Sequence, residues 1–222
     1  MTNYVPIFFD IETTGFNPLQ QAYFDDLNQD AQVTAIGVGL IDDGWKNGKG
    51  YDECESEVHV LYDESEYRLL ENLNGKLEEW VAEYEEKGYS PFLVTFNGRQ
   101  FDHPYLGARY ARLRLDGSWW NHRLKRLDMM RALGKHWGKV DRYPSEDDCL
   151  EAANIESTDP YDGSDMPEAF SERDWDMISE HVEKDTREMI KLFCDVPEMC
   201  MSEFYSHYDV DADATFTEEV EF

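Results

Sequence analysis

Four carboxylates in three separated motifs have the local setting that phosphate chemistry requires. They are Asp10 and Glu12 in FFDIETTGF, Asp102 in NGRQFDHPYL and Asp185 in HVEKDTREM. Carboxylates that converge on one point repel each other unless divalent cations lie between them, and hard oxygen ligands favour Mg²⁺ or Mn²⁺ over Zn²⁺. Two such ions held together catalyse in-line cleavage of a phosphodiester. The residue types therefore predict a metal-dependent nuclease.

The first motif ends an apolar strand. Residues 4–9 are apolar or aromatic and lead directly into Asp10. Because side chains alternate between the faces of a strand, Asp10 and Glu12 share one face while Ile11 points into the core on the other. Gly15 then allows a tight turn or close approach of the backbone to a ligand. The alternative is an edge strand with both carboxylates in water, but the TTG that follows the apolar run makes the pattern more specific.

The second motif joins a strand to a helix. Residues 91–96 form an apolar run, Asn97-Gly98 breaks it, and residues 101–115 have a helical pattern with Asp102 in the first turn. The helix dipole favours a carboxylate at that position. An ordinary acidic residue at a helix start is the alternative, and for Asp102 taken alone it would be preferred.

The third motif lies on a predicted helix from about Ser171 to Asp195. Its apolar residues recur at the spacing of one buried face. His181 and Asp185 are four residues apart and therefore lie on the same side of that helix. A single His–Asp pair of this kind is more often a surface pair, so the functional interpretation depends on the two preceding motifs.

The three motifs, in this order, resemble those of DEDD-type 3′–5′ exonucleases of the RNase H-like superfamily. More narrowly, the chain resembles the stand-alone relatives of the family B DNA polymerase proofreading domain. The resemblance extends to about Asp195, with DIETTG, NGRQFD and HVEKD in the motif positions and LDMMRAL and SEDDCLEAANI between the last two. It implies an α/β fold with an RNase H-like mixed five-stranded sheet flanked by helices. It also implies that two Mg²⁺ or Mn²⁺ ions act on single-stranded or frayed DNA, with the ligands Asp10, Glu12, Asp102 and Asp185.

His181 departs from both branches of this family. One branch has Tyr four residues before the last Asp, and the other has His five residues before it. Here His181 is four residues before Asp185, and the residue five before is Glu180. We expect His181 to occupy the tyrosine position and to orient or deprotonate the attacking water. Asp128 begins a helical stretch, and a helix cap is the preferred interpretation over a place near the metals.

A basic, aromatic segment follows the second motif. Residues 99–142 contain eleven Lys or Arg and four Asp or Glu, a local formal charge of +7 in a chain of net charge −29. Cations beside aromatic rings suit the backbone and bases of a single strand. The alternative is that the Trp residues are core and the Arg residues solvated. The resemblance places Phe16 against the terminal base, and the full set of expected substrate contacts is Thr13, Phe16, Asn97, Arg99, Trp119, Trp120, Arg123, Lys125 and Arg126.

The remaining composition is acidic and lacks membrane or export signals. No stretch has the length and apolarity of a transmembrane helix, and we expect neither a signal peptide nor a membrane partner. Four cysteines without a C-x-x-C pair indicate free thiols and a cytoplasmic location, in the host if the source is viral. High negative charge favours a halophilic source or its virus, since salt at about 1 M shortens the Debye length to roughly 3 Å. An acidic protein from an ordinary phage is the alternative.

The predicted organisation is an exonuclease domain over residues 1–195 and an acidic tail over 196–222. We expect the tail to be solvated, with docking to a replication or repair protein as the weaker alternative. The polar residues 17–32 either line the substrate channel or form a passive insertion. Strands are expected at 4–10, 33–42, 56–62, 91–96 and 124–128, and helices at 65–87, 101–115, about 145–154 and 171–195. An exoribonuclease of the same fold and a catalytically silent nucleic-acid-binding scaffold are the alternative functions.

Overall fold

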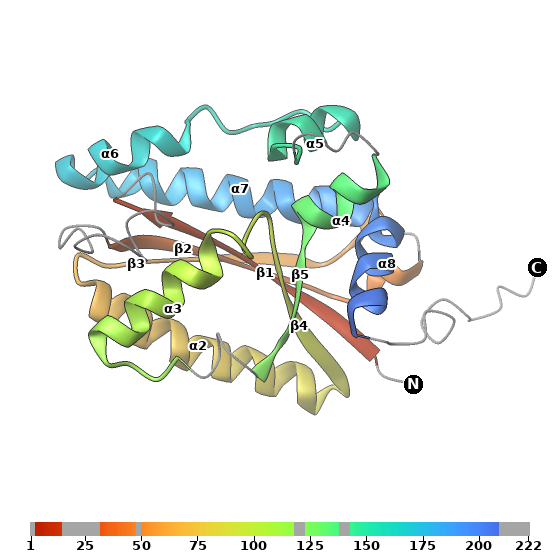
Figure 1. The fold of residues 1–222 in the computed structure, drawn as a ribbon, viewed down its shortest axis with the longest axis horizontal. Coiled ribbons are helices and arrows are strands. Elements are labelled where there is room, and N and C mark those ends of the chain that lie inside the picture. The colour runs from red at the N-terminus through yellow and green to blue at the C-terminus, as the bar shows by residue number, and fades with distance from the viewer. Residues whose placement is uncertain (1–2, 15–31, 48–49, 118–122, 138–142, 209–222) are drawn as a thin grey trace, which may run out of the picture.

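A five-stranded mixed sheet forms the centre of the computed structural model, which describes residues 3–14, 32–47, 50–117, 123–137 and 143–208 (Figure 1). The strand order is β3-β2-β1-β4-β5. β1 pairs antiparallel with β2, which pairs antiparallel with β3, whereas β4 and β5 run parallel to β1. The strand bounds are β1 (Asn3–Thr13), β2 (Val33–Ile41), β3 (Ser56–Tyr62), β4 (Tyr89–Thr95) and β5 (Lys125–Asp128).

Helices cover both faces of this sheet (Figure 1). On one face lie α2 (Glu66–Glu86) and α3 (Asp102–Leu113). The other face carries α4 (Met129–His136), α5 (Glu146–Ala152), α6 (Met166–Glu172), α7 (Trp175–Asp195) and α8 (Pro197–Tyr208). The predicted α/β class with a mixed five-stranded sheet flanked by helices is confirmed. None of the helices in the described ranges is long and apolar enough to cross a membrane.

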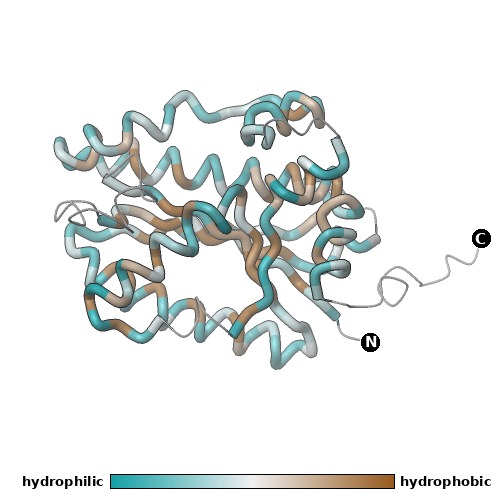
Figure 2. Tube along the Cα trace, viewed as in Figure 1, coloured by the Kyte–Doolittle hydropathy of each residue, from teal (hydrophilic) through white to brown (hydrophobic). Residues whose placement is uncertain are grey.

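The two faces of β1 belong to different cores. Phe8 is buried in the cluster with α7 and α8, whereas Phe9 and Ile11 are buried in the cluster with α2 and α3. Figure 2 shows hydrophobic residues concentrated on the central strands. By the alternation of side chains, Asp10 and Glu12 continue the face of Phe8, on the side of α7. Parallel pairing also brings the carboxyl ends of β1, β4 and β5 to one edge of the sheet.

Glycines in β2 allow α7 to lie close to the sheet. A Cβ atom at Gly37 would lie 2.0 Å from the Thr186 Oγ1 and 3.0 Å from the Val182 carbonyl oxygen, and one at Gly39 would lie 2.7 Å from a side-chain carbon of Ile190. Gly37 is also the partner of Asp10 in the β1–β2 ladder. The missing side chain therefore places α7 directly beside the acidic end of β1.

Two parts of the chain differ from the sequence-based expectation. The helix expected from about Ser171 is divided, because α6 ends at Glu172, Arg173 adopts a φ of 63° and the Asp174 side chain caps α7.

Residues Pro197–Tyr208 were expected in a solvated tail, but they form α8. This expectation is wrong because α8 buries Cys200, Met201, Phe204 and Tyr205 against the sheet and α4. The sequence gives no clear helical period here, because these residues are interspersed with acidic and polar ones. Residues 209–222 lie outside the described residues, and the division of the chain into two domains stays a prediction.

Candidate metal and active site

The four predicted carboxylates meet at one end of the sheet. Asp10 and Glu12 come from β1, Asp102 from the first turn of α3 and Asp185 from the middle of α7. The negative charges of Glu12 and Asp102 act on Asp10, and the charges of Asp10 and Glu12 act on Asp185. Asp102 is only 2% exposed and Glu12 8%. The fold thus gathers in one cluster all four side chains that the motifs singled out, with Asp185 at its more exposed side.

Burial and mutual repulsion disfavour the charged forms of these acids. Burial is the largest cause and raises the pKa of Glu12, raises the pKa values of Asp10 and Asp102 well above the usual range, and raises that of Asp185 to about 9. The Oδ2 atom of Asp10 is buried without a hydrogen-bond partner among the described residues. Hard, clustered and unsatisfied carboxylate oxygens fit divalent cations such as Mg²⁺ or Mn²⁺.

His181 lies against this acidic cluster. Its Nε2 is 3.3 Å from Glu12 Oε1 and 3.6 Å from Asp185 Oδ2. Ligand atoms of these three residues lie within 4.8 Å of one another, so His181 could also contribute to a metal site. Burial lowers the pKa of His181, but the hydrogen bond and charge of Glu12 together with the charge of Asp185 outweigh burial and raise the pKa to about 10.

The other ring nitrogen of His181 is held by a residue that the motifs did not indicate. Nδ1 is hydrogen-bonded to Oδ2 of Asp159, whose side chain is 5% exposed. A carboxylate accepts, so the ring donates its Nδ1 proton and Nε2 is left facing the acidic cluster. Asp159 thereby selects the ring orientation and tautomer.

Glu188 anchors the loop that carries Asp159. It lies two turns after His181 on α7 and is buried at 3% exposure. Its carboxylate accepts hydrogen bonds from Ser157 Oγ at 3.1 Å and from the Thr158 backbone N–H at 2.5 Å. One helix therefore holds both the histidine and the loop that orients it. Sequence reasoning missed this arrangement because Asp159 lies in an irregular segment between helices.

A further carboxylate, Glu146, borders the site from α5. Its Oε1 is buried without a hydrogen-bond partner among the described residues. Burial, followed by the charges of Asp185 and Asp10, raises its pKa well above the usual range. The sequence signal was hidden because Glu146 stands in a capping box made by Ser145 and Asp148, where acidic residues are expected for the helix alone.

Asp128 is the N-cap of α4, as expected. Its Oδ1 accepts from the Arg131 backbone N–H at 3.3 Å, and its Oδ2 accepts from the Arg99 backbone N–H at 3.0 Å. Burial raises the pKa of Asp128, although these hydrogen bonds oppose the change. The cap therefore also joins the loop after β4 to the start of α4.

The expected substrate contacts lie in several settings. Thr13 is buried at the end of β1, and Asn97 follows β4 with a φ of 60° and a buried Oδ1 that has no partner among the described residues. Arg99 and Arg123 are exposed. Phe16, Trp119 and Trp120 lie outside the described residues. The proposed contacts of all these residues with substrate stay predictions.

Not every cation of the basic segment is directed outward. The Lys125 ammonium is hydrogen-bonded to the Tyr4 hydroxyl and lies 5.2 Å from the centre of the Tyr208 ring. Arg109 is buried with Glu66 on the opposite side of the sheet. Arg126 lines a pocket beside the acidic cluster. The segment therefore divides into cations that hold the fold together and cations that face a cavity or solvent.

Comparisons with known proteins agree with this fold. A model of the RNase H superfamily matches residues 7–196. The family B DNA polymerase of the archaeon Pyrobaculum calidifontis has a TM-score of 0.54 and 14% identity, over 85% of this chain and 24% of the polymerase chain. E. coli exonuclease I with a 5cy-dT13 oligonucleotide has a TM-score of 0.51 and 12% identity, over 91% of this chain and 43% of its own.

A zinc-bound complex of E. coli exonuclease I with single-stranded DNA gives a TM-score of 0.52 and 13% identity, over 93% of this chain and 43% of the exonuclease. The chain thus spans less than half the length of the exonuclease I chains. No curated protein matches it. At these identities the structural likeness shows the fold, and the resemblance expected from the three motifs is confirmed at that level.

Proposed function

This chain belongs to the RNase H superfamily, and we propose that it is a metal-dependent 3′–5′ exonuclease acting on single-stranded or frayed DNA. The observation that carries the proposal is the convergence of Asp10, Glu12, Asp102 and Asp185 in one cluster, where burial raises all four pKa values and the neighbouring carboxylate charges raise those of Asp10, Asp102 and Asp185 further. Such an arrangement is expected where cations and a phosphate complete the site. The exonuclease I complexes with single-stranded DNA support the choice of substrate by analogy of fold.

The carboxylates would hold two Mg²⁺ or Mn²⁺ ions. When bound, the ions would neutralise charge on the phosphate and favour the attack of water. Asp10 is the central ligand of the proposal, since it extends from the middle strand and has a buried oxygen without a hydrogen-bond partner in the described ranges. Asp102 and Asp185 approach from helices on opposite faces of the sheet.

His181 would orient the attacking water or accept its proton. Its Nδ1 donates to Asp159, so Nε2 carries the free lone pair when the ring is neutral and faces Glu12 and Asp185. Cations bound to the carboxylates would oppose the rise in the pKa of His181 and favour the neutral ring. In this proposal Asp159 is a positioning residue that acts through His181.

A time course on end-labelled strands tests the proposed function. DNA and RNA of the same sequence, labelled at the 5′ or 3′ end, would be incubated with Mg²⁺, Mn²⁺ or a chelator. We expect a descending ladder from the 5′ label on DNA, immediate release of the 3′ label, and no cleavage with the chelator. Asp10→Asn, purified in parallel, excludes a contaminating nuclease.

The same assay separates the alternatives. Cleavage restricted to RNA would replace the proposal with an exoribonuclease, because the 2′-OH would then be the group that is recognised. Internal fragments at early times would indicate an endonuclease. Strand binding without cleavage under any metal condition would indicate a silent binding protein.

A further inference from the structure

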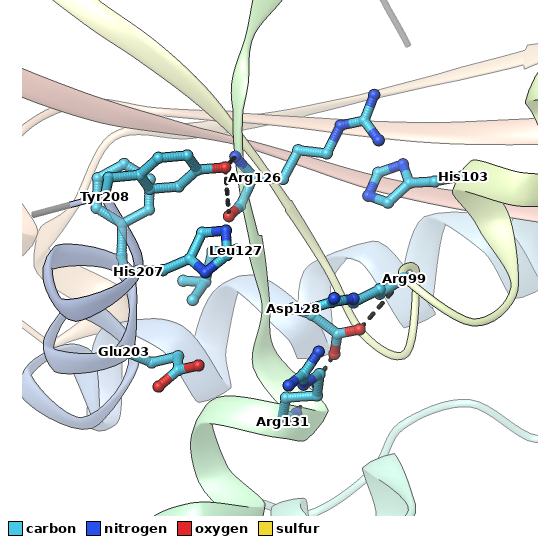
Figure 3. Close-up of a pocket in the computed structure, with 10 residues that line it drawn as sticks. Arg99, His103, Arg126, Leu127, Asp128, Arg131, Glu203, His207 and Tyr208 are labelled. Atoms are coloured by element: carbon cyan, nitrogen blue, oxygen red, sulfur yellow. Dashed lines mark hydrogen bonds between the residues drawn. The ribbon is translucent and has the colours of Figure 1, made fainter. Parts of the chain in front are cut away.

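A basic cavity lies beside the acidic cluster. It has a volume of about 220 Å³, far above the about 10–15 Å³ that one water requires. Figure 3 shows the side chains that line it, which come from the loop after β4, α3, β5, α4 and α8. The lining residues are Arg99, His103, Arg126, Leu127, Asp128, Arg131, Glu203, Phe204, His207 and Tyr208.

The cavity adjoins the proposed metal site through two direct links. His103 follows Asp102 in the first turn of α3. The Asp128 charge is close enough to Asp102 to raise its pKa, after the larger effect of burial. A strand whose end lies at the carboxylates is therefore within reach of this cavity.

Several nitrogen atoms of the cavity lack partners. Arg126 Nη2, Arg131 Nε and His103 Nδ1 are buried without hydrogen bonds to any residue that the structure describes. Leaving a buried donor without an acceptor is unfavourable, and more so when the group is charged. These unpartnered nitrogens suit a ligand that offers several acceptor oxygens.

The two acidic residues of the lining, Asp128 and Glu203, have other partners and only partly offset the positive charge of the Arg side chains. Asp128 accepts from two backbone N–H groups and faces the charge of Arg131. Glu203 is paired with Lys135. No carboxylate among the described residues pairs with Arg126, whose backbone N–H donates to the Tyr208 hydroxyl at 2.8 Å (Figure 3). The Arg126 backbone is thus held at the cavity wall, and its guanidinium charge is not compensated by a carboxylate of the described residues.

We propose that this cavity binds one backbone phosphate of the nucleic-acid strand, near the end that enters the acidic cluster. The inference rests on the proposed function, since it assigns a subsite to the same substrate. Guanidinium groups match the oxygens of a phosphate with directed, charge-assisted hydrogen bonds. A strand carries phosphates at regular intervals, so a phosphate at the cleavage site requires others close by. An acidic peptide, by contrast, would be repelled by the carboxylates next to the cavity.

Strands with a single neutral linkage test the assignment. A DNA 12-mer series, each with one methylphosphonate at a different linkage from the 3′ end, would be titrated by fluorescence anisotropy in chelator, so that no cleavage occurs. We expect one linkage at which neutralisation weakens binding by about tenfold, in line with a hydrogen bond to a charged group. Arg126→Met should weaken binding of the unmodified strand by a similar factor and lose sensitivity at that linkage alone.

Two controls accompany this series. Arg68→Met removes an exposed cation from α2, on the other face of the sheet, and should keep the position-dependent profile. Arg131→Met provides a second cavity variant should Arg126→Met fail to fold, as judged by thermal melting. Loss of one phosphate contact should also reduce the slope of binding against salt by about one.

An unchanged profile in both Arg126→Met and Arg131→Met would overturn the proposal. A second combination of results would also overturn it. Every strand in the series would bind equally, and a peptide of residues 209–222 would bind in a manner that depends on Arg126. The cavity would then bind acidic peptides rather than a phosphate of the strand. Failure of the proposed function is distinguishable: a position-dependent profile without any cleavage refutes the nuclease and keeps the subsite. Cleavage from the 3′ end, with binding that does not depend on the position of the neutral linkage, keeps the nuclease and refutes the subsite.

Discussion

Glu66 and the acidic cluster around Asp10 are both buried carboxylates, but the fold treats their charges in opposite ways. Glu66 Oε1 accepts from the Arg109 guanidinium at 2.7 Å and from the Val33 backbone N–H at 2.8 Å. Asp10 faces Glu12 and other carboxylates, and its Oδ2 has no partner in the described part of the chain. A structural charge is neutralised by the protein itself, whereas the charge of the site is left for a ligand.

The largest expected effect concerns the cluster. Asp10→Asn should lower the cleavage rate by about 10³-fold or more, the scale expected when a group that stabilises charge in the transition state is removed. It should also raise the melting temperature in chelator, since one charge leaves a repulsive group. Single-turnover rates and thermal melts measure both. Substantial Mg²⁺-dependent activity in Asp10→Asn would refute the ligand assignment.

The opposite result is expected at the neutralised pair. Arg109→Met should lower the free energy of unfolding by about 3–5 kcal/mol, because it leaves the buried Glu66 carboxylate without its cation. Activity per folded molecule should stay close to wild type. Denaturant unfolding gives the stability, and Glu66→Gln/Arg109→Met should recover part of it. A stable Arg109→Met protein with reduced cleavage would place this pair in the site and remove the contrast.

The next largest effect is expected at β2, which contacts both Glu66, through the Val33 backbone N–H, and α7, through Gly37. Gly37→Ala should lower stability by about 1–3 kcal/mol, the usual result of overpacking, because its Cβ would lie 2.0 Å from Thr186 Oγ1. Displacement of α7 should also reduce cleavage. The matched control is Gly75→Ala on α2, where a Cβ meets nothing within 4 Å and helix propensity predicts a gain of about 0.5–1 kcal/mol. Equal effects of the two substitutions would show that α7 does not depend on Gly37.

Local patterns predicted the parts of this molecule that local physics determines. Residues 4–9 form a strand because they are apolar, and alternation then places Asp10 and Glu12 on one face. The side of α7 that carries His181 and Asp185 follows equally from helical spacing. These features need only neighbours in the sequence.

Features that depend on distant partners were missed. Arg109 lies in the basic segment, but its partner Glu66 is 43 residues away. Asp159 acquires its role only because Glu188 holds its loop against α7. The apolar residues of α8 show a purpose only once α4 and the sheet are in place. A single sequence contains no local signal for such contacts.

Asp159 differs from the four carboxylates of the cluster, because it pairs with His181 and orients its ring. Asp159→Asn keeps the shape of the side chain but removes its charge, and we expect about a tenfold loss in the cleavage rate, in the range found for residues that orient a catalytic ligand. The pH dependence of the rate should change as well, whereas KM for the strand should not. In a protein that already carries His181→Ala, Asp159→Asn should cause no further loss in the cleavage rate. Additive losses in the double variant would show that Asp159 does not act through His181.

The smallest expected effect is a pH dependence confined to the cluster. The pKa of Asp185 is raised to about 9 from an ordinary value of 3.8. Because the folded state binds this proton more tightly, the associated stability is present below about pH 4 and is lost as pH rises to about 9. His181, with its pKa raised to about 10 from 6.5, acts in the same direction at higher pH. In chelator the melting temperature should therefore fall by a few degrees between pH 6 and 9, where about 1 kcal/mol corresponds to about 2–4 °C for a chain of this size.

Saturating Mg²⁺ should flatten this dependence, since cations replace the protons on the carboxylates. Asp185→Asn should flatten it without metal, whereas Glu66→Gln should change the stability but leave the slope in place. A slope that persisted in Asp185→Asn and in Mg²⁺ would mean that the protonation change lies outside the cluster. The pH dependence of the melting temperature would then not distinguish the acidic cluster from the carboxylate of Glu66, which the fold itself neutralises.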